Sequence, residues 1–170
     1  MEKDKFLYTD SDEKNLKRFD RELSVQLANR ARVNPKSRYF IFSPRYRNAF
    51  QYGRYLKNRL VSSVQVIYDQ DQISKYYNEE TKKLGNFAVI SRALTDRDHQ
   101  QQGNMTELIN YTLDEMTKNR FDSALALVHP ENKQGNGLFR DKLKFKNIGQ
   151  YKYQYEDETE TDLNMYAIEL

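Results

Sequence analysis

A turn at residues 96–106 carries the residue types best suited to bind an anion. It reads Asp-Arg-Asp-His-Gln-Gln-Gln-Gly-Asn-Met-Thr and stands directly before a strongly amphipathic stretch. A helix N-terminus offers unpaired backbone N–H groups and the positive end of the helix dipole. Gly103 would let the backbone approach an anion closely, so the turn is a candidate pyrophosphate cradle. A plain strand-to-helix turn explains the same residues and stays open.

Titratable side chains that could move a proton near this turn are few. The strand expected at 86–95 contains no Asp, Glu or His, and Glu80, which precedes it, is a weak candidate base. Tyr151 and Tyr153 alternate along a C-terminal strand and share one face, so either hydroxyl is a weak candidate acid. His129 follows an apolar run and is interpreted first as a packed strand-end residue, with a role as base as the alternative.

Composition excludes several other chemistries. The 170 residues include no Cys and two His, which removes disulfides and thiolate sites and makes a zinc site unexpected; no metal is expected. No apolar run approaches the length of a membrane span, and the N-terminus lacks the apolar stretch of a signal peptide. Hydrophobic residues make up 38% and charged residues 31%, as in an ordinary globular protein. We therefore expect a soluble, cytoplasmic protein with no membrane partner.

Charge is unevenly distributed along the chain. No Asp or Glu occurs between Arg30 and Tyr68, whereas residues 156–162 are strongly acidic. Within 38–59, arginines alternate with tyrosines, a pattern that can bind phosphates and stack on bases. A solvated helix face over an aromatic core is the simpler interpretation. The acidic loop is most simply a solvated hairpin tip, although it could attract the basic face of another copy and form a homodimer.

Hydrophobic patterning predicts an alternation of strands and helices in one domain. The amphipathic helix is the clearest element, because Met105, Leu108, Ile109, Thr112, Leu113 and Met116 fall on one stripe. The strands are expected at 5–9, 39–42, 60–68, 86–95, 124–128, 148–155 and 163–170, and further helices at about 10–27, 45–52 (or a turn) and 135–142. The last two strands should form an antiparallel hairpin. The fold class is α/β (α+β), with a mixed central sheet flanked by helices.

Two motifs in this order resemble the GNAT superfamily of acyl-CoA N-acyltransferases. Its turn reads Gln/Arg-x-x-Gly-x-Gly/Ala; this chain matches at Gln100 and Gly103 and departs at Met105. Farther along, Asn132 and Phe139 match the loop and short helix that follow the next strand. Many members have a Tyr on that helix, where its hydroxyl protonates the leaving thiolate. The corresponding positions here are Phe139 and Arg140.

The resemblance implies that acetyl-CoA lies where two adjacent strands separate. The backbone of 93–95 would bind the pantetheine arm, and the amides of 101–106 the pyrophosphate. The implied acetyl-CoA contacts are Ala93, Leu94, Thr95, Gln100, Gln101, Gln102, Gly103, Asn104, Met105, Thr106, Asn132 and Phe139.

The expected activity is transfer of acetyl from acetyl-CoA to a primary amine by a single acyl-CoA-binding domain spanning 1–170. A basic face at 38–59 would flank the acceptor and favour an anionic one. The alternative is a degenerate member that binds CoA or a nucleic acid without chemistry. An unrelated nucleic-acid-binding module is a third, less favoured interpretation. The acceptor, the acyl chain length and the oligomeric state stay open.

Overall fold

The structure, a computed structural model, describes residues 49–57, 59–154 and 160–170. The elements expected at 5–9, 10–27 and 39–42 lie outside these residues. The described elements follow in this order: β1 (Ala49–Leu56), β2 (Arg59–Ile67), α2 (Gln70–Ile73), the 3-10 turns η2 (Ser74–Tyr76) and η3 (Thr81–Leu84), β3 (Phe87–Thr95), the 3-10 turn η4 (Arg97–His99), α3 (Asn104–Lys118), β4 (Ser123–Val128), α4 (Lys133–Gly137), the π-helical turn η5 (Leu138–Lys142), β5 (Lys146–Gln154) and β6 (Glu160–Glu169).

The described strands form one sheet of six, in the order β1-β2-β3-β4-β6-β5. Only the central pair, β3 with β4, is parallel; the other neighbours are antiparallel. The expected mixed sheet with flanking helices and a C-terminal antiparallel hairpin is therefore confirmed. A parallel pair needs a crossover, and α3 supplies it.

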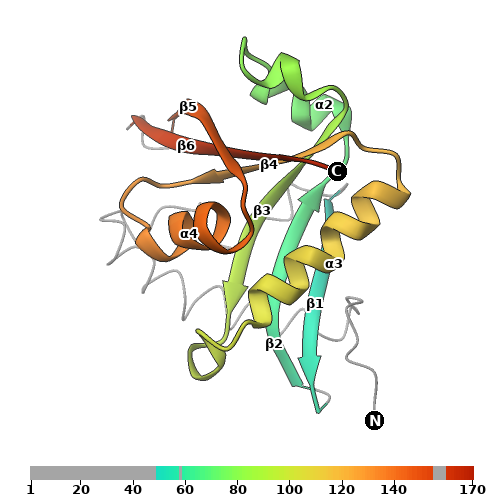
Figure 1. Cartoon of the computed structure of the whole chain (residues 1–170), viewed down its shortest axis with the longest axis vertical. Helices are drawn as coiled ribbons and strands as arrows, with labels where there is room; N and C mark the ends of the chain where they lie inside the picture. The colour runs from blue at the N-terminus through green and yellow to red at the C-terminus, as the bar shows by residue number, and fades with distance from the viewer. Residues whose placement is uncertain (1–48, 58, 155–159) are drawn as a thin grey trace.

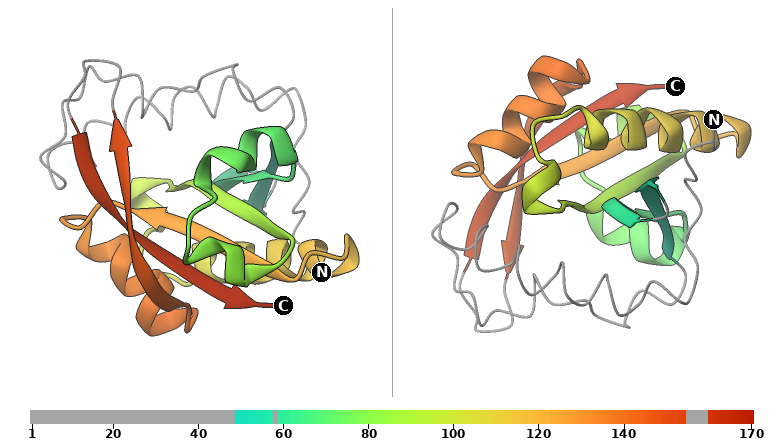
Figure 2. Two further views of the ribbon diagram at one scale, coloured as in Figure 1. Left: turned by 90° about the horizontal axis from the view of Figure 1, so that it is seen from above. Right: turned by 90° about the horizontal axis from the view of Figure 1, so that it is seen from below.

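Helices cover both faces of this sheet (Figures 1 and 2). On one face, α3 and η5 pack on the sheet and form a core that we call the α3-side cluster. It includes Val64, Val66, Ala88, Ile90, Leu108, Ile109, Met116, Phe139 and Tyr166. On the other face, α2 and η2 contribute to the α2-side cluster. It includes Ile67, Ile73, Tyr76, Phe87, Val89, Leu125, Met165 and Ala167.

Helix α3 confirms the predicted stripe. Leu108, Ile109, Thr112 and Met116 are buried, and Met105 is half-buried against the α3-side cluster. Complete burial of a side chain such as Leu or Met is worth about 1.5–3 kcal/mol. Met105 thus begins the core face of the helix, as the sequence interpretation favoured.

The strands after β1 begin and end within three residues of their predicted bounds, whereas two predicted helices need correction. The helix or turn expected at 45–52 is wrong over its described part, because Ala49–Leu56 is β1, paired with β2 through Phe50↔Val66 and Tyr52↔Val64. Pairing with an apolar strand outweighs the local signal. The helix expected from Gly135 begins at Lys133, because the Asn132 side chain caps it by accepting from Gly135 N at 3.0 Å.

Candidate functional site

Strands β3 and β4 separate toward their C-terminal ends. Their pairing runs from Phe87↔Ser123 to Ile90↔Ala126 and stops there, although β3 continues to Thr95. Burial changes at the same point, from buried side chains at 87–90 to half-buried ones at 91–95. Figure 1 shows the two strands running apart. Backbone groups on the β4 side of 91–95 therefore lack ladder partners in β4.

A bulge at Arg92 accompanies this separation. The β2–β3 register shifts between Gln65↔Ser91 and Ser63↔Leu94, and Arg92 has φ 50°. A left-handed residue other than Gly in a strand costs of order 1–3 kcal/mol, and such strain is found at binding sites more often than elsewhere. The bulge bends β3, which carries 93–95 away from β4.

The turn after β3 ends in a helix start that no side chain caps. Gly103 is the N-cap residue of α3, with φ 81° and no side-chain cap hydrogen bond. A Cβ added to Gly103 would meet nothing within 4 Å. The residue that begins α3 therefore has open space beside it, and no side chain caps the helix start, as an anion-binding helix N-terminus requires.

Arg54 of β1 lies next to this helix start. Its guanidinium is buried; Nε donates to Asn104 Oδ1 at 2.8 Å, and Nη2 lies 2.6 Å from Glu107 Oε2. Asn104 Nδ2 in turn donates to the His99 carbonyl at 3.0 Å. These contacts tie the first turn of α3 to β1 and to the loop before it. The Arg54 charge is balanced by Glu107 at this helix start.

Arg59 holds the other end of the same loop. Its Nη2 donates to the buried Asp96 Oδ2 at 2.8 Å, and Asp96 Oδ1 accepts from Asp98 N. The described arginines of the basic stretch, Arg54 and Arg59, thus hold the loop that links β3 to α3. The other arginines of that stretch lie outside the described residues.

The glutamines of the turn play different parts. Gln100 Nε2 donates to the Thr95 carbonyl at 3.3 Å, and Gln102 Nε2 donates to the Asp98 carbonyl at 3.1 Å. Gln101 is exposed, with φ 61°. The turn is therefore held by its own side chains, with Ala93 packed against the α3-side cluster behind it.

The segment after β4 is organised around Asn136. Its Nδ2 donates to the carbonyls of His129 and Asn132, at 2.9 and 2.8 Å, and its Oδ1 accepts from Tyr166 Oη at 2.8 Å and from Asn164 Nδ2. Phe139 is buried, and its ring stacks on that of Tyr166 with centroids 6.3 Å apart. Phe139 therefore serves the core, and Asn132 caps α4.

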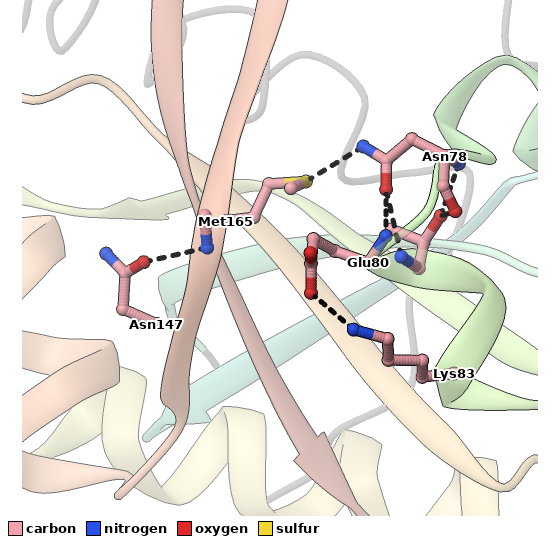
Figure 3. Close-up of polar contacts among 7 residues, drawn as sticks. Asn78, Glu80, Lys83, Asn147 and Met165 are labelled. Carbon is pink, nitrogen blue, oxygen red and sulfur yellow. Dashed lines mark hydrogen bonds and ion pairs between the residues drawn. The ribbon is translucent and has the colours of Figure 1, made fainter.

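Glu80 lies on the opposite face of the sheet, beside the C-terminal hairpin. Its Cγ is 3.8 Å from where a Cβ on Gly149 would be, and its carboxylate pairs with Lys83 Nζ at 3.1 Å. Figure 3 shows Glu80 and Asn78 next to Met165, and Asn78 Nδ2 lies 3.8 Å from the Met165 sulfur. Met165 pairs with Leu127 of β4 and with Gly149 of β5, so Glu80 lies beside the β5–β6 hairpin.

Tyr151 lies on this face too, but its hydroxyl is already engaged. It donates to the Lys75 carbonyl at 3.0 Å, and its ring lies 5.3 Å from that of Tyr76. Burial raises the pKa of Tyr151 above its ordinary value. Tyr153 is half-buried, with its ring 6.4 Å from that of Tyr151, as expected for alternate residues of one strand.

The sequence prediction did not single out Gln65, Ser91, Arg92 or Asn136, and it placed Arg54 in the basic stretch rather than at the start of α3. The bulge at Arg92 and the hydrogen bonds of Asn136 depend on contacts between distant segments, so no local sequence pattern indicates them. Among the residues that the structure describes, no cluster of three or more His, Asp or Glu could hold a metal. No helix in the described ranges is long and apolar enough to cross a membrane.

Comparison with known proteins gives a clear answer at the level of fold. No protein-family model matches the sequence, and no curated protein is similar to it in sequence. Among solved structures, an N-acetyltransferase from Staphylococcus aureus Mu50 aligns with TM-score 0.67 at 11% identity over 96% of this chain and 95% of its own.

Two further structures align over the same share of this chain. FeeM, an N-acyl amino acid synthase from uncultured soil microbes, has TM-score 0.67 at 15% identity, with 88% of its chain covered. A GNAT-family acetyltransferase from Staphylococcus aureus Mu50 has TM-score 0.61 at 10% identity, with 96% of its chain covered. The chain therefore has the fold of the GNAT acetyltransferases.

Proposed function

We propose that this protein transfers an acyl group from an acyl-CoA, with acetyl-CoA as the expected donor, to a primary amine. One observation carries the proposal. Strand β3 continues from Ser91 to Thr95 without β4 as a partner and leads through a short loop into a helix whose N-terminus no side chain caps. The unpaired strand edge would bind the pantetheine arm of the donor, and the helix start that follows it along the chain would bind the pyrophosphate.

The donor would be held mainly by backbone groups. The free edge at 93–95 supplies hydrogen bonds for the amides of the pantetheine arm, and the amides at 101–106 supply the pyrophosphate contacts. Open space at Gly103, and the Arg54 contacts that hold the first turn of α3 in place, support this placement. Asn132 and Phe139 would act indirectly, by shaping the segment that covers the far side of the separation.

The chemistry requires two bond changes and three proton transfers. The neutral amine nitrogen attacks the thioester carbonyl and the C–S bond breaks; the ammonium gives up one proton before the attack, the nitrogen loses a second proton after it, and the departing sulfur takes up one proton to leave as a thiol. A lysine-like amine with pKa about 10.4 is free in only about one molecule in 2,500 at pH 7, so it must first lose a proton. A backbone N–H at the free edge of β3 would stabilise the oxyanion.

Glu80 is the proton acceptor that we favour, because it is a carboxylate on the face opposite α3, beside the hairpin whose strand β6 pairs with β4. Tyr151 is less suited to be the acid, since its proton is directed to the Lys75 carbonyl. The leaving sulfur would take its proton from Tyr153 or from water. General acid–base help is worth about 10²–10⁴-fold, so a transferase without a dedicated acid would be slow rather than inactive.

Donor binding can be tested with a truncated thioester. Calorimetry with acetyl-CoA and with acetyl-pantetheine compares the same acyl arm with and without the pyrophosphate. Tighter binding of acetyl-CoA, by at least about tenfold, is expected from charge-assisted contacts at the helix start. Equal affinity for the two ligands would contradict pyrophosphate binding at the start of α3. If neither ligand binds, the proposed function is wrong.

A further inference from the structure

Methionine is the sulfur-containing residue of this chain. The sequence has four Met and no Cys, so thiol oxidation is excluded and a peroxide can oxidise sulfur only at methionine. Met116 and Met165 are 0% and 1% exposed and belong to the clusters on the two faces of the sheet. Met105 is half-buried, and Met1 lies outside the described residues. Among the described methionines, solvent therefore reaches Met105 and not the other two.

Met105 lies in the first turn of α3, where the pyrophosphate of the donor would bind. Glu107 N donates to the Gly103 carbonyl at 3.0 Å and begins the helical hydrogen bonds of α3. The amides of Asn104, Met105 and Thr106 precede this hydrogen bond and have no helical acceptor. The backbone of Met105 is therefore one of the groups that would hold the donor.

Two kinds of contact hold this first turn in place. Asn104 is held by polar contacts, because it accepts from Arg54 Nε at 2.8 Å and donates to the His99 carbonyl at 3.0 Å. Met105 supplies an apolar contact, since its side chain packs against the α3-side cluster. Met105 is also the position at which the turn departs from the sequence pattern that it resembles. An oxidisable thioether thus helps to anchor the helix start.

We propose that Met105 is a peroxide-sensitive modification site, at which oxidation of the thioether to the sulfoxide weakens binding of the acyl donor. The sulfur attacks one oxygen of hydrogen peroxide, an S–O bond forms and the O–O bond breaks. Sulfur is oxidised by two electrons, and the second oxygen takes up the proton of the first and leaves as water. This inference rests on the proposed function, because the ligand affected is the proposed donor.

Oxidation would act through the packing of the helix start. A sulfoxide is polar, and placing its oxygen against apolar side chains without a hydrogen-bond partner is unfavourable. The oxidised side chain of Met105 therefore leaves the α3-side cluster for solvent. The first turn keeps its polar contacts at Asn104 and loses its apolar contact. An anion at a helix start needs amides that point together at the ligand, so a loosened first turn binds the pyrophosphate more weakly.

The test measures acetyl-CoA affinity before and after oxidation. The protein is treated with hydrogen peroxide, freed of it, and analysed by peptide mass spectrometry and by calorimetry with acetyl-CoA. We expect Met105 to gain one oxygen before Met116 and Met165 do, and the affinity to fall by about tenfold in step with that gain. Methionine sulfoxide reductases return the thioether and should restore the affinity.

Met105→Leu and Met165→Leu are matched variants, because each replaces one methionine with an apolar residue of similar volume. The affinity of Met105→Leu for acetyl-CoA should be the same before and after peroxide, whatever its starting value. Met165→Leu should lose affinity by the same factor as wild type. Reversal by the reductases is measured on wild type, so the test does not depend on the folding of a variant.

The inference and the proposed function fail in different ways. If Met105 is oxidised and the affinity is unchanged, or if Met105→Leu loses affinity after peroxide as wild type does, the inference is wrong. Oxidation of Met116 or Met165 before Met105 also overturns it. If the untreated protein binds no acetyl-CoA, the proposed function is wrong and the inference falls with it. If acetyl-CoA binds and no amine is acetylated, the proposed transfer is wrong, and the effect of Met105 is judged on binding alone.

Discussion

Glu79 and Glu80 are neighbouring glutamates in different surroundings, so comparing their variants distinguishes a catalytic role from the effect of an exposed charge. Glu80 and Glu79 each pair with a lysine three residues ahead, but the Glu79 side chain is 86% exposed and that of Glu80 is 48% exposed beside the hairpin. The Cγ of Glu80 lies 3.8 Å from where a Cβ on Gly149 of the hairpin would be. We therefore propose Glu80, and not Glu79, as the proton acceptor, although the two side chains are chemically identical.

We expect Glu80→Gln to lower kcat by about 10²-fold or more at pH 7, because general base help is worth at least that much. Acetyl-CoA affinity should not change. Glu79→Gln is the control and should retain wild-type kcat. The loss should shrink at high pH, where the amine is free without help. Equal rates for the two variants would exclude Glu80 as the base.

His129 makes a prediction about pH and stability. Burial lowers the pKa of His129, while the charge of Glu131 opposes the shift, and His129 Nδ1 accepts from Glu131 N at 3.2 Å. The folded state thus favours the neutral ring. Below about pH 6.5 the unfolded chain binds more protons at this site, so the free energy of unfolding should fall as pH falls.

His129→Asn keeps a short acceptor and removes the titration. Denaturant unfolding from pH 7 to pH 5 should show a smaller loss of stability in this variant than in wild type. A loss of the same size in both proteins would mean that His129 does not contribute to the acid sensitivity.

At the scale of elements, the start of α3 should bind the pyrophosphate. Gly103→Glu and Gly103→Gln impose the same side-chain size and the same left-handed strain, since φ is 81° and the space is open. They differ only in charge. A unit charge about 6 Å from the anion costs about 2–3 kcal/mol at an effective dielectric constant of about 20. We expect the Glu variant to bind acetyl-CoA at least about tenfold more weakly than the Gln variant.

Added salt should reduce the difference in acetyl-CoA affinity between the Glu and Gln variants, because salt screens charges that lie near solvent. Calorimetry at low and high ionic strength measures both effects. If the two variants bind equally at low salt, the pyrophosphate lies elsewhere.

Arg54 should position the same helix start. Arg54→Gln removes contacts to Asn104 and Glu107, and hydrogen bonds to charged groups contribute about 1.5–3 kcal/mol each. We expect a loss of about 2 kcal/mol, or about 4–8 °C in the unfolding midpoint, together with weaker acetyl-CoA binding. Lys118→Gln breaks an exposed pair at the other end of α3 and should change neither. Unchanged binding in Arg54→Gln would restrict Arg54 to a structural role.

The sequence predicted the elements whose pattern is local. The α3 stripe, the apolar β4 and the C-terminal hairpin were found because periodicity marks them. Other elements depend on pairing between strands. The sequence predicts a helix or turn at the start of β1, but this segment forms a strand because it pairs with β2. The turn before α3 could be located from Gly103, whereas the bulge at Arg92 depends on register between distant strands.

At the scale of the whole molecule, the two faces of the sheet would have different roles, one binding the acyl donor and the other receiving the amine. The uncapped helix start and Arg54 lie on the α3 face, whereas Glu80 lies on the other. The strand separation is the one place in the described sheet where adjacent strands lose their pairing before both end. A thioester held from one face could meet an amine from the other through this separation.

Amine-dependent release of CoA from acetyl-CoA tests this account most directly. Thiol release should be measured over a panel of primary amines from pH 6 to pH 9, with mass spectrometry of the N-acetyl product. We expect release above buffer for at least one amine, with one acetylated product per thiol and a rate that rises with pH as the free amine accumulates. Confirmed acetyl-CoA binding with no thiol release above buffer for any amine would contradict the account and leave a binding protein without chemistry.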